Sequence, residues 1–235
     1  MSTAPGEPAV PRSVLPWVER IGIPKPLMWG YVAVLVFMIG DGVESNYLEP
    51  YLRDSGFSSS GAGLVISAYG AFVAIGSWLS GALSNLWGPR RVMRIGAVLW
   101  ILFEVLFLAV ALPIHNQTLV FVFYGLRGIA YPLFAYAFLL WIQLTARKEL
   151  RGSAAGWFWF AYSAGLPTIG SGIAAVSIPL LGAYATFWLS LALVVRWARR
   201  SVRSPYVRHA VPGRWWTPRR RASACGTNWY GASAY

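Results

Sequence analysis

The sequence contains very little cysteine, histidine and charge, and each scarcity removes a class of protein. With Cys225 as its one cysteine, the chain cannot form an intrachain disulfide or a cysteine zinc site. Its two histidines, His115 and His209, are far apart in sequence, so we expect no metal site and no cofactor. Charged residues make up 12% of the chain, against about 25% in soluble domains. The composition therefore argues against a water-soluble domain.

Hydrophobic residues dominate instead, at 57% of 235 residues. A helix of about 20 apolar residues crosses the bilayer core, and five segments reach this length while a sixth is apolar but short. No nucleophile, base and metal arrangement is visible, so we do not expect an enzyme. The sequence predicts an all-α membrane domain over residues 26–195, with six transmembrane helices at 27–47, 63–83, 95–114, 119–142, 154–176 and 182–195.

Basic residues mark one side of the predicted bundle. Lys and Arg near span ends stay on the cytoplasmic side. Three predicted connections, after the first, third and fifth spans, lie on the opposite side. The first of them carries Arg53, and the other two carry no Lys or Arg. We therefore predict a multi-pass protein of the bacterial inner membrane with both termini cytoplasmic, residues 1–25 forming a cytoplasmic segment. The nine cations on the inner side are Arg12, Arg20, Lys25, Arg90, Arg91, Arg94, Arg147, Lys148 and Arg151.

Residues 196–235 differ from the rest of the chain. They hold nine Arg and no Asp or Glu, and so supply most of the formal net charge of +12. The remaining basic excess fits the positive-inside rule, so nucleic-acid binding is not expected. We expect an irregular basic tail produced by a reading frame lost near Val195, which leaves a truncated protein. The alternative is a genuine extension lying on anionic lipid.

Ionisable residues inside the predicted spans are candidates for function, because such groups are costly in lipid unless they face a cavity or a partner. Asp41 and Glu44 are three residues apart on the first span and so share one helix face, with Glu44 nearer the outer surface. Arg127 lies on the fourth span. We predict a polar cavity in which Asp41 and Arg127 carry proton coupling and Glu44 binds substrate. The alternative is a structural ion pair between helices.

Two further residues are weaker candidates. Glu104 lies near the middle of the third span, where a hydrogen-bonded structural role between helices is favoured over a functional one. Tyr131, on the same span as Arg127, is a possible contact for a sugar-like ligand, although most aromatic residues of this chain are expected to face lipid or neighbouring helices.

A motif at the end of the second span suggests a family. The stretch GALSNLWGPRR at residues 81–91 resembles the signature G-x-L-x-D-R-x-G-R-R of the major facilitator superfamily, with Asn85 in place of the acid and Leu86 in place of the base. Arg127 stands where the fourth-span motif of that superfamily places its arginine. The resemblance implies a cytoplasmic gating loop that includes Gly81, Leu83, Asn85, Gly88, Arg90 and Arg91.

Two stretches of the first span are more specific. IPKPLMWGY at 23–31 and GDGVESNYL at 40–48 resemble the polyol permease family, which includes ribitol and D-arabitol permeases. The resemblance implies the N-terminal half of a transporter for proton-linked uptake of a sugar alcohol, with the site between two six-helix halves. The implied partners are a polyol, protons, the lipid bilayer, and a missing C-terminal half or a dimer partner. Alternatives are an inactive or accessory half-module, or transport of a carboxylate such as 2-oxoglutarate.

Overall fold

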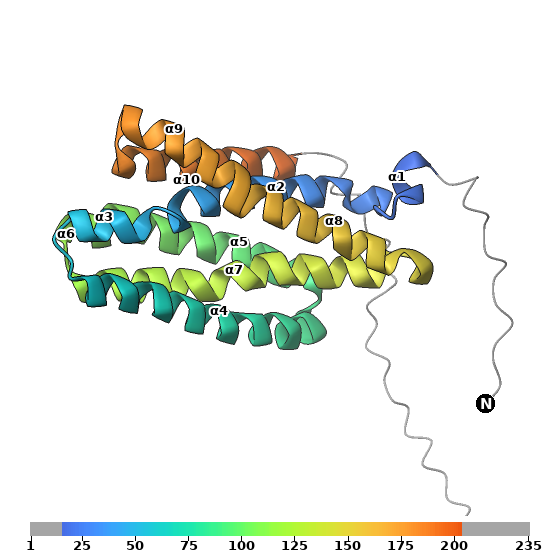
Figure 1. Cartoon of the computed structure of the whole chain (residues 1–235). Helices are drawn as coiled ribbons and strands as arrows, with labels where there is room; N and C mark the ends of the chain where they lie inside the picture. Colours follow the sequence, from blue (N-terminus) through green and yellow to red (C-terminus); the bar gives the residue numbers. More distant parts are fainter. Residues whose placement is uncertain (1–15, 204–235) are drawn as a thin grey trace, which may run out of the picture.

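The computed structural model describes residues 16–203, and for residues 200–203 only the backbone. Helices make up nearly all of this part of the chain, and no strand occurs in it (Figure 1). The helices are α1 (Trp17–Arg20), α2 (Met28–Ser45), α3 (Leu48–Asp54), α4 (Ser59–Trp87), α5 (Pro89–Leu106), α6 (Leu112–Ile114), α7 (Gln117–Thr145), α8 (Arg151–Ser163), α9 (Ser171–Leu181) and α10 (Ala183–Arg203). Short 3₁₀ turns at Lys25–Leu27 and Lys148–Leu150 precede α2 and α8, and π-helical turns η3 (Phe107–Ala111) and η5 (Ala164–Gly170) continue α5 and α8.

The two longest helices begin at residues whose side chains cap them. The hydroxyl of Ser58 accepts a hydrogen bond of 3.0 Å from the backbone N–H of Gly61 at the start of α4. The side-chain oxygen of Asn116 accepts from the N–H of Thr118 at 2.9 Å at the start of α7. Such caps satisfy N–H groups that have no partner within the helix. Both helices therefore begin a few residues before the apolar segments at 63–83 and 119–142.

Five helical stretches of the described chain are long and apolar enough to cross a membrane, and they match the first five predicted spans. They are Lys25–Asp54, Ser59–Trp87, Pro89–Ile114, Gln117–Thr145 and Lys148–Leu181. Each extends beyond the predicted segment because hydropathy marks the lipid-facing middle of a span, whereas the helix continues through its polar ends.

The predicted sixth span is not among these stretches. α10 begins as expected, but Arg196 and Arg199 lie in its second half. The helix also continues through residues 196–203, where the sequence predicts an irregular tail, so that part of the tail prediction is wrong. The remainder of the predicted tail, at 204–235, and most of the predicted N-terminal segment, at 1–15, lie outside the described residues.

The helices surround α7 and α2, which are the most buried of the spans by share of residues. α7 packs along α4 and α5, whereas α2 packs against α8, η5, α9 and α10 (Figure 1). α7 also contacts α8, which joins the two groups of helices. α3, α6 and the turn between α9 and α10 lie at one end of the bundle, and α1 lies at the other (Figure 1).

Glycines let the backbones of α2 and η5 touch. A methyl group at Gly42 would overlap the carbonyl of Leu166, and one at Gly170 would lie 2.9 Å from the backbone of Gly42. The amide of Asn46 reinforces the contact, donating to the carbonyl of Gly42 at 2.6 Å and to that of Leu166 at 3.3 Å. Close approach of this kind is the usual role of small residues between membrane helices. It fixes the rotation of α2, and therefore the direction in which its acidic residues point.

The residues predicted to form a gating loop are largely helical. Gly81, Leu83 and Asn85 lie in the last turns of α4, and Arg90 and Arg91 lie in the first turn of α5. The connection is Gly88 alone, with φ 83° and ψ 144°. Only glycine adopts this conformation without strain. The motif therefore specifies a sharp helix–helix corner rather than an extended loop.

We predict that Gly88→Ala destabilises the protein by about 1–3 kcal/mol, because alanine is strained at this φ and ψ. Thermal unfolding of the purified protein in detergent, followed by circular dichroism, measures the change. Gly81→Ala is the matched control, since a methyl group at Gly81 would meet nothing within 4 Å. Equal melting temperatures for Gly88→Ala and the wild type would show that the corner is not constrained.

Candidate functional site

Four charged side chains form a cluster between α2, α5 and α7. Asp41 and Glu44 lie on one face of α2, because side chains three residues apart point the same way. Arg127 of α7 donates from Nη2 to Oδ1 of Asp41 at 2.6 Å and from Nη1 to Oε1 of Glu44 at 2.5 Å. Its Nε lies 2.7 Å from Oε2 of Glu104 on α5. One guanidinium group thus joins three spans.

This charged cluster, defined as Asp41, Glu44, Glu104 and Arg127, is enclosed by the protein. The side chains of Arg127, Glu44 and Glu104 are 0% exposed, and that of Asp41 is 3% exposed. If all four groups are ionised, three negative charges face one positive charge. Buried charge without compensation is costly in a medium of low dielectric constant. Protons bound to the carboxylates would remove this excess of negative charge.

Three aromatic rings cover the guanidinium of Arg127. Its Cζ lies 4.9 Å from the ring centre of Trp100, 5.1 Å from that of Tyr124 and 5.8 Å from that of Tyr69. A cation near an aromatic ring is attracted to the ring's negative face. Trp100 comes from α5, Tyr124 from α7 and Tyr69 from α4. The aromatic cover therefore adds α4 to the three helices that hold the charged cluster.

Carboxylate oxygens in the charged cluster lack hydrogen-bond donors. Oε2 of Glu44 and Oε1 of Glu104 are buried and accept no hydrogen bond. The other oxygen of each carboxylate lies against the same guanidinium, at Nη1 and Nε of Arg127. An ionised carboxylate is an acceptor only, whereas a protonated one also has a donor. These two enclosed oxygens are therefore candidate sites for a proton.

The charged residues that sequence reasoning selected in the spans all meet in this one cluster. Asp41 and Arg127 are paired, an arrangement common to the predicted polar site and to the alternative structural ion pair. The side chain of Glu44 is fully enclosed by the protein, and its predicted depth, nearer the outer surface, stays a prediction. Glu104, for which a separate structural role is favoured in the sequence, belongs to the same cluster. Sequence position alone could not show this, because it does not give the rotation of one helix relative to another.

The predicted candidate Tyr131 lies beside the charged cluster. Its ring packs against Tyr136 of α7, with centroids 6.0 Å apart, and against Tyr162 of α8, with centroids 6.4 Å apart. Tyr131 is four residues after Arg127 on α7, so the two side chains share one face of that helix. Phe37, four residues before Asp41 on α2, lies against Tyr131 with ring centroids 6.2 Å apart. We call Tyr131, Tyr136 and Tyr162 the tyrosine group. It borders the charged cluster where α2 meets α7.

Sequence reasoning missed the aromatic cover of Arg127. A signal for two of its members was present: Tyr124 is three residues before Arg127 on α7, and Trp100 is four residues before Glu104 on α5. Residues at these spacings share a helix face. Tyr69 had no such signal, because its span carries no ionisable residue between Ser59 and Trp87.

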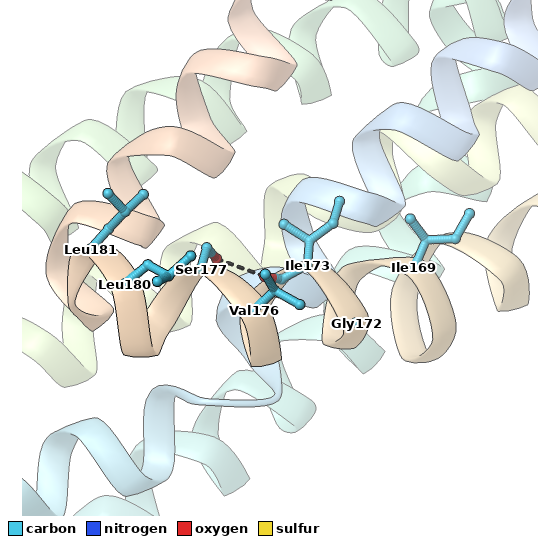
Figure 2. A pocket seen from close by; sticks show the side chains of 7 residues that line it. All are labelled: Ile169, Gly172, Ile173, Val176, Ser177, Leu180 and Leu181. Carbon is cyan, nitrogen blue, oxygen red and sulfur yellow. Dashed lines mark hydrogen bonds between the residues drawn. The ribbon is translucent and has the colours of Figure 1, made fainter.

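A groove of about 580 Å³ runs along η5 and α9, apart from the charged cluster (Figure 2). Its polar side chain, Ser177, donates to the carbonyl of Ile173 at 2.7 Å and is therefore already satisfied (Figure 2). Such a surface suits an apolar neighbour in the membrane rather than a polar solute. The lining residues are Ile169, Gly172, Ile173, Val176, Ser177, Leu180 and Leu181.

A multi-span helical bundle with ionisable groups enclosed between its spans is characteristic of membrane transport proteins, because such groups mark ion and substrate pathways. The chain belongs to the Major Facilitator Superfamily, whose family model matches residues 16–226. This membership confirms the predicted resemblance and places the chain among transport proteins rather than enzymes. The matched range also reaches into residues 196–226, where the sequence predicts an unrelated tail.

Three relatives carry specific names. The chain is 44% identical over 170 residues to the ribitol transporter of Klebsiella pneumoniae, covering 72% of this chain and 40% of that protein. It is 43% identical over 174 residues to the D-arabinitol transporter of Klebsiella pneumoniae, covering 74% and 41%. It is 38% identical over 177 residues to the alpha-ketoglutarate permease of Bacillus subtilis (strain 168), covering 75% and 41%. The chain thus spans about two fifths of the length of the curated relatives it matches.

Proposed function

We propose that this chain supplies one six-helix half of a secondary transporter that couples proton entry to the uptake of a sugar alcohol. The observation that carries the proposal is the charged cluster, in which one guanidinium holds three carboxylates. Each half of a major facilitator transporter contains two inverted three-helix repeats. In this chain α2 and α5 belong to the first repeat and α7 to the second. The ion pairs of Arg127 therefore cross the boundary between repeats.

Proton binding changes these ion pairs. A proton on Asp41 removes its negative charge and weakens its bond to Arg127, while the bonds from Arg127 to Glu44 and Glu104 remain. Loss of that proton restores the ion pair of Asp41 with Arg127 and tightens the contact between α2 and α7. Two bonding states of one cluster thus correspond to two arrangements of the repeats, and a solute that binds one arrangement better shifts the equilibrium toward it.

The charge of the site favours a neutral polyol over a carboxylate. Arg127 is the cation of the site, yet it is fully enclosed and already pairs with three carboxylates. A carboxylate solute would meet an excess of negative charge and no free cation within the charged cluster. A polyol avoids this repulsion and can donate hydrogen bonds to carboxylate oxygens. The two Klebsiella relatives are named as transporters of sugar alcohols, which supports a polyol as the solute. The Bacillus relative is named as an alpha-ketoglutarate permease, so 2-oxoglutarate is tested as well.

The proposed transporter lies in a bacterial inner membrane with both ends of this chain in the cytoplasm, which the distribution of Lys and Arg supports. Its solute site is completed by a second six-helix half, or by another copy of this chain.

A chimera tests the transport function. Residues 20–195 replace the corresponding segment of the Klebsiella ribitol transporter, and uptake of labelled ribitol and 2-oxoglutarate into proteoliposomes is measured with and without an inward proton gradient. We predict gradient-driven ribitol uptake by the chimera. Asp41→Asn in the chimera is expected to abolish the gradient dependence, because an amide cannot carry the proton.

Two comparisons complete this test. Glu49→Gln is the matched control, since Glu49 pairs with Arg53 at the surface and lies outside the charged cluster. Normal gradient-driven uptake by Asp41→Asn would remove Asp41 from the coupling mechanism, and uptake of 2-oxoglutarate in place of ribitol would contradict the polyol assignment. Absence of gradient-driven flux from the chimera would contradict the proposed transport function.

A further inference from the structure

We propose that the tyrosine group, Tyr131, Tyr136 and Tyr162, is the solute-binding surface of this half. Its ligand is a neutral polyhydroxylated molecule whose hydroxyl groups bond to the tyrosine hydroxyls and to Asp41. The inference rests on the proposed function and names the residues that recognise the solute. It places solute recognition at the tyrosine group, next to the charged cluster that binds the proton, and Asp41 takes part in both.

Two helices bring the tyrosine group together. Tyr131 and Tyr136 come from α7 and Tyr162 comes from α8, and the ring of Tyr131 lies between the other two at 6.0 and 6.4 Å. Trp159 extends this surface along α8, with its ring 5.4 Å from that of Tyr162. The rings present apolar faces to C–H groups, and the three phenols add hydroxyls that both donate and accept. This combination matches an acyclic polyol, whose carbon chain carries a hydroxyl on successive atoms.

One hydroxyl of the group lacks a partner. Tyr131 is 3% exposed, and its Oη is buried without a hydrogen bond. The ring of Tyr162 is 6.4 Å away between centroids, but no hydrogen bond joins the hydroxyl of Tyr131 to that of Tyr162 in this structure. A buried polar group without a partner is costly, and such groups in native proteins call for an explanation. A ligand hydroxyl between Tyr131 and Tyr162 would bond to both.

Access and charge agree with this location. Tyr136 and Tyr162 are half-buried and Trp159 is 45% exposed, so the group opens toward the outside of this half. Behind it, Asp41 is the one acid of the charged cluster whose side chain keeps any exposure, at 3%. In the part of the chain that the structure describes, no cation–ring contact occurs at these three tyrosines, and the guanidinium of Arg127 lies against other aromatic residues. The site therefore offers acceptors and hydroxyls, and it does not offer a counter-ion for an anion.

Binding to the chain itself tests this proposal without requiring transport. The purified full chain in lipid nanodiscs is titrated with ribitol and, separately, with 2-oxoglutarate, and binding is measured by calorimetry. We expect saturable ribitol binding. Tyr131→Phe and Tyr162→Phe are each expected to weaken it about fivefold, as the loss of one hydrogen bond does. Tyr51→Phe is the control, because Tyr51 is an aromatic residue of α3 that packs against Phe187, outside the tyrosine group.

Each outcome decides the proposal. Ribitol binding that is weakened by Tyr131→Phe and Tyr162→Phe but not by Tyr51→Phe supports it, provided that circular dichroism shows the same helix content and melting temperature in all four proteins. Absence of ribitol binding by the wild-type chain overturns it, as does equal binding by wild type and variants. Binding of 2-oxoglutarate alone also overturns it. Failure of the chimera to transport would leave a positive binding result intact, so the two proposals fail separately.

Discussion

Arg127→Leu is expected to destabilise the protein by about 3–5 kcal/mol, the range found when one partner of a buried ion pair is removed. The side chain is fully enclosed, and its loss leaves Asp41, Glu44 and Glu104 facing one another without a cation. It also removes the group on which Trp100, Tyr124 and Tyr69 converge. Thermal unfolding in detergent, together with the monodisperse fraction on size-exclusion chromatography, measures the effect.

Arg53→Leu is the matched control for this substitution. Arg53 also pairs with an acid at 2.5 Å, but the side chains of Arg53 and Glu49 are 51% and 44% exposed. Exposed pairs contribute about 1 kcal/mol or less. A combined variant with Asp41→Asn, Glu44→Gln and Glu104→Gln added to Arg127→Leu should recover part of the lost stability, because no net charge then remains in the cluster. If Arg127→Leu and Arg53→Leu had equal effects, the enclosed ion pairs would not hold the helices together.

Gly42→Ala is expected to have the next largest effect. The added methyl group would overlap the carbonyl of Leu166, which belongs to the backbone and cannot rotate away. Forcing extra carbon into a tightly packed contact costs about 1–3 kcal/mol. The substitution should also turn or shift α2 relative to η5, and so weaken the bond of 2.6 Å between Asp41 and Arg127. We expect a lower melting temperature and, in the chimera, weaker dependence of uptake on the proton gradient.

Gly172→Ala is the control for crowding at Gly42. Gly172 lies in the fifth span, which also contains Leu166, but a methyl group at Gly172 would meet nothing within 4 Å. Alanine is favoured over glycine inside a helix by about 1 kcal/mol, so this variant should be as stable as the wild type or more so. If Gly172→Ala lost as much stability as Gly42→Ala, the effect at Gly42 could not be assigned to its contact with the carbonyl of Leu166.

The fold was largely predictable because hydropathy and helix caps are local. The five apolar segments coincide with the five spans found in the described chain. Two features could not be obtained in this way. The end of α10 was misplaced, since a helix can continue into a basic segment that is too polar to lie in lipid. The motif at 81–91 was interpreted as a loop, whereas a glycine at φ 83° lets two helices meet at one residue.

For the candidate site, sequence reasoning found the charged residues but not their arrangement. The low tolerance of lipid for charge selects Asp41, Glu44, Glu104 and Arg127 without any structure. It does not show that Glu104 reaches the same guanidinium as Asp41 and Glu44, because a span's rotation about its own axis is not encoded in its hydropathy. The aromatic cover of Arg127 has the same origin, because two of its rings are contributed by α4 and α5, which are distant in sequence from Arg127.

The sequence by itself determined that this protein is a helical membrane chain. It also identified the five segments that are long and apolar enough to cross the membrane, and the charged residues within them. Both properties follow from free energies of transfer that belong to each residue separately. The tertiary structure alone decided which charges meet, and that the tyrosine group lies beside Asp41. The physical reason is that these contacts depend on the rotation and spacing of packed helices, fixed where backbones touch at Gly42 and Gly170.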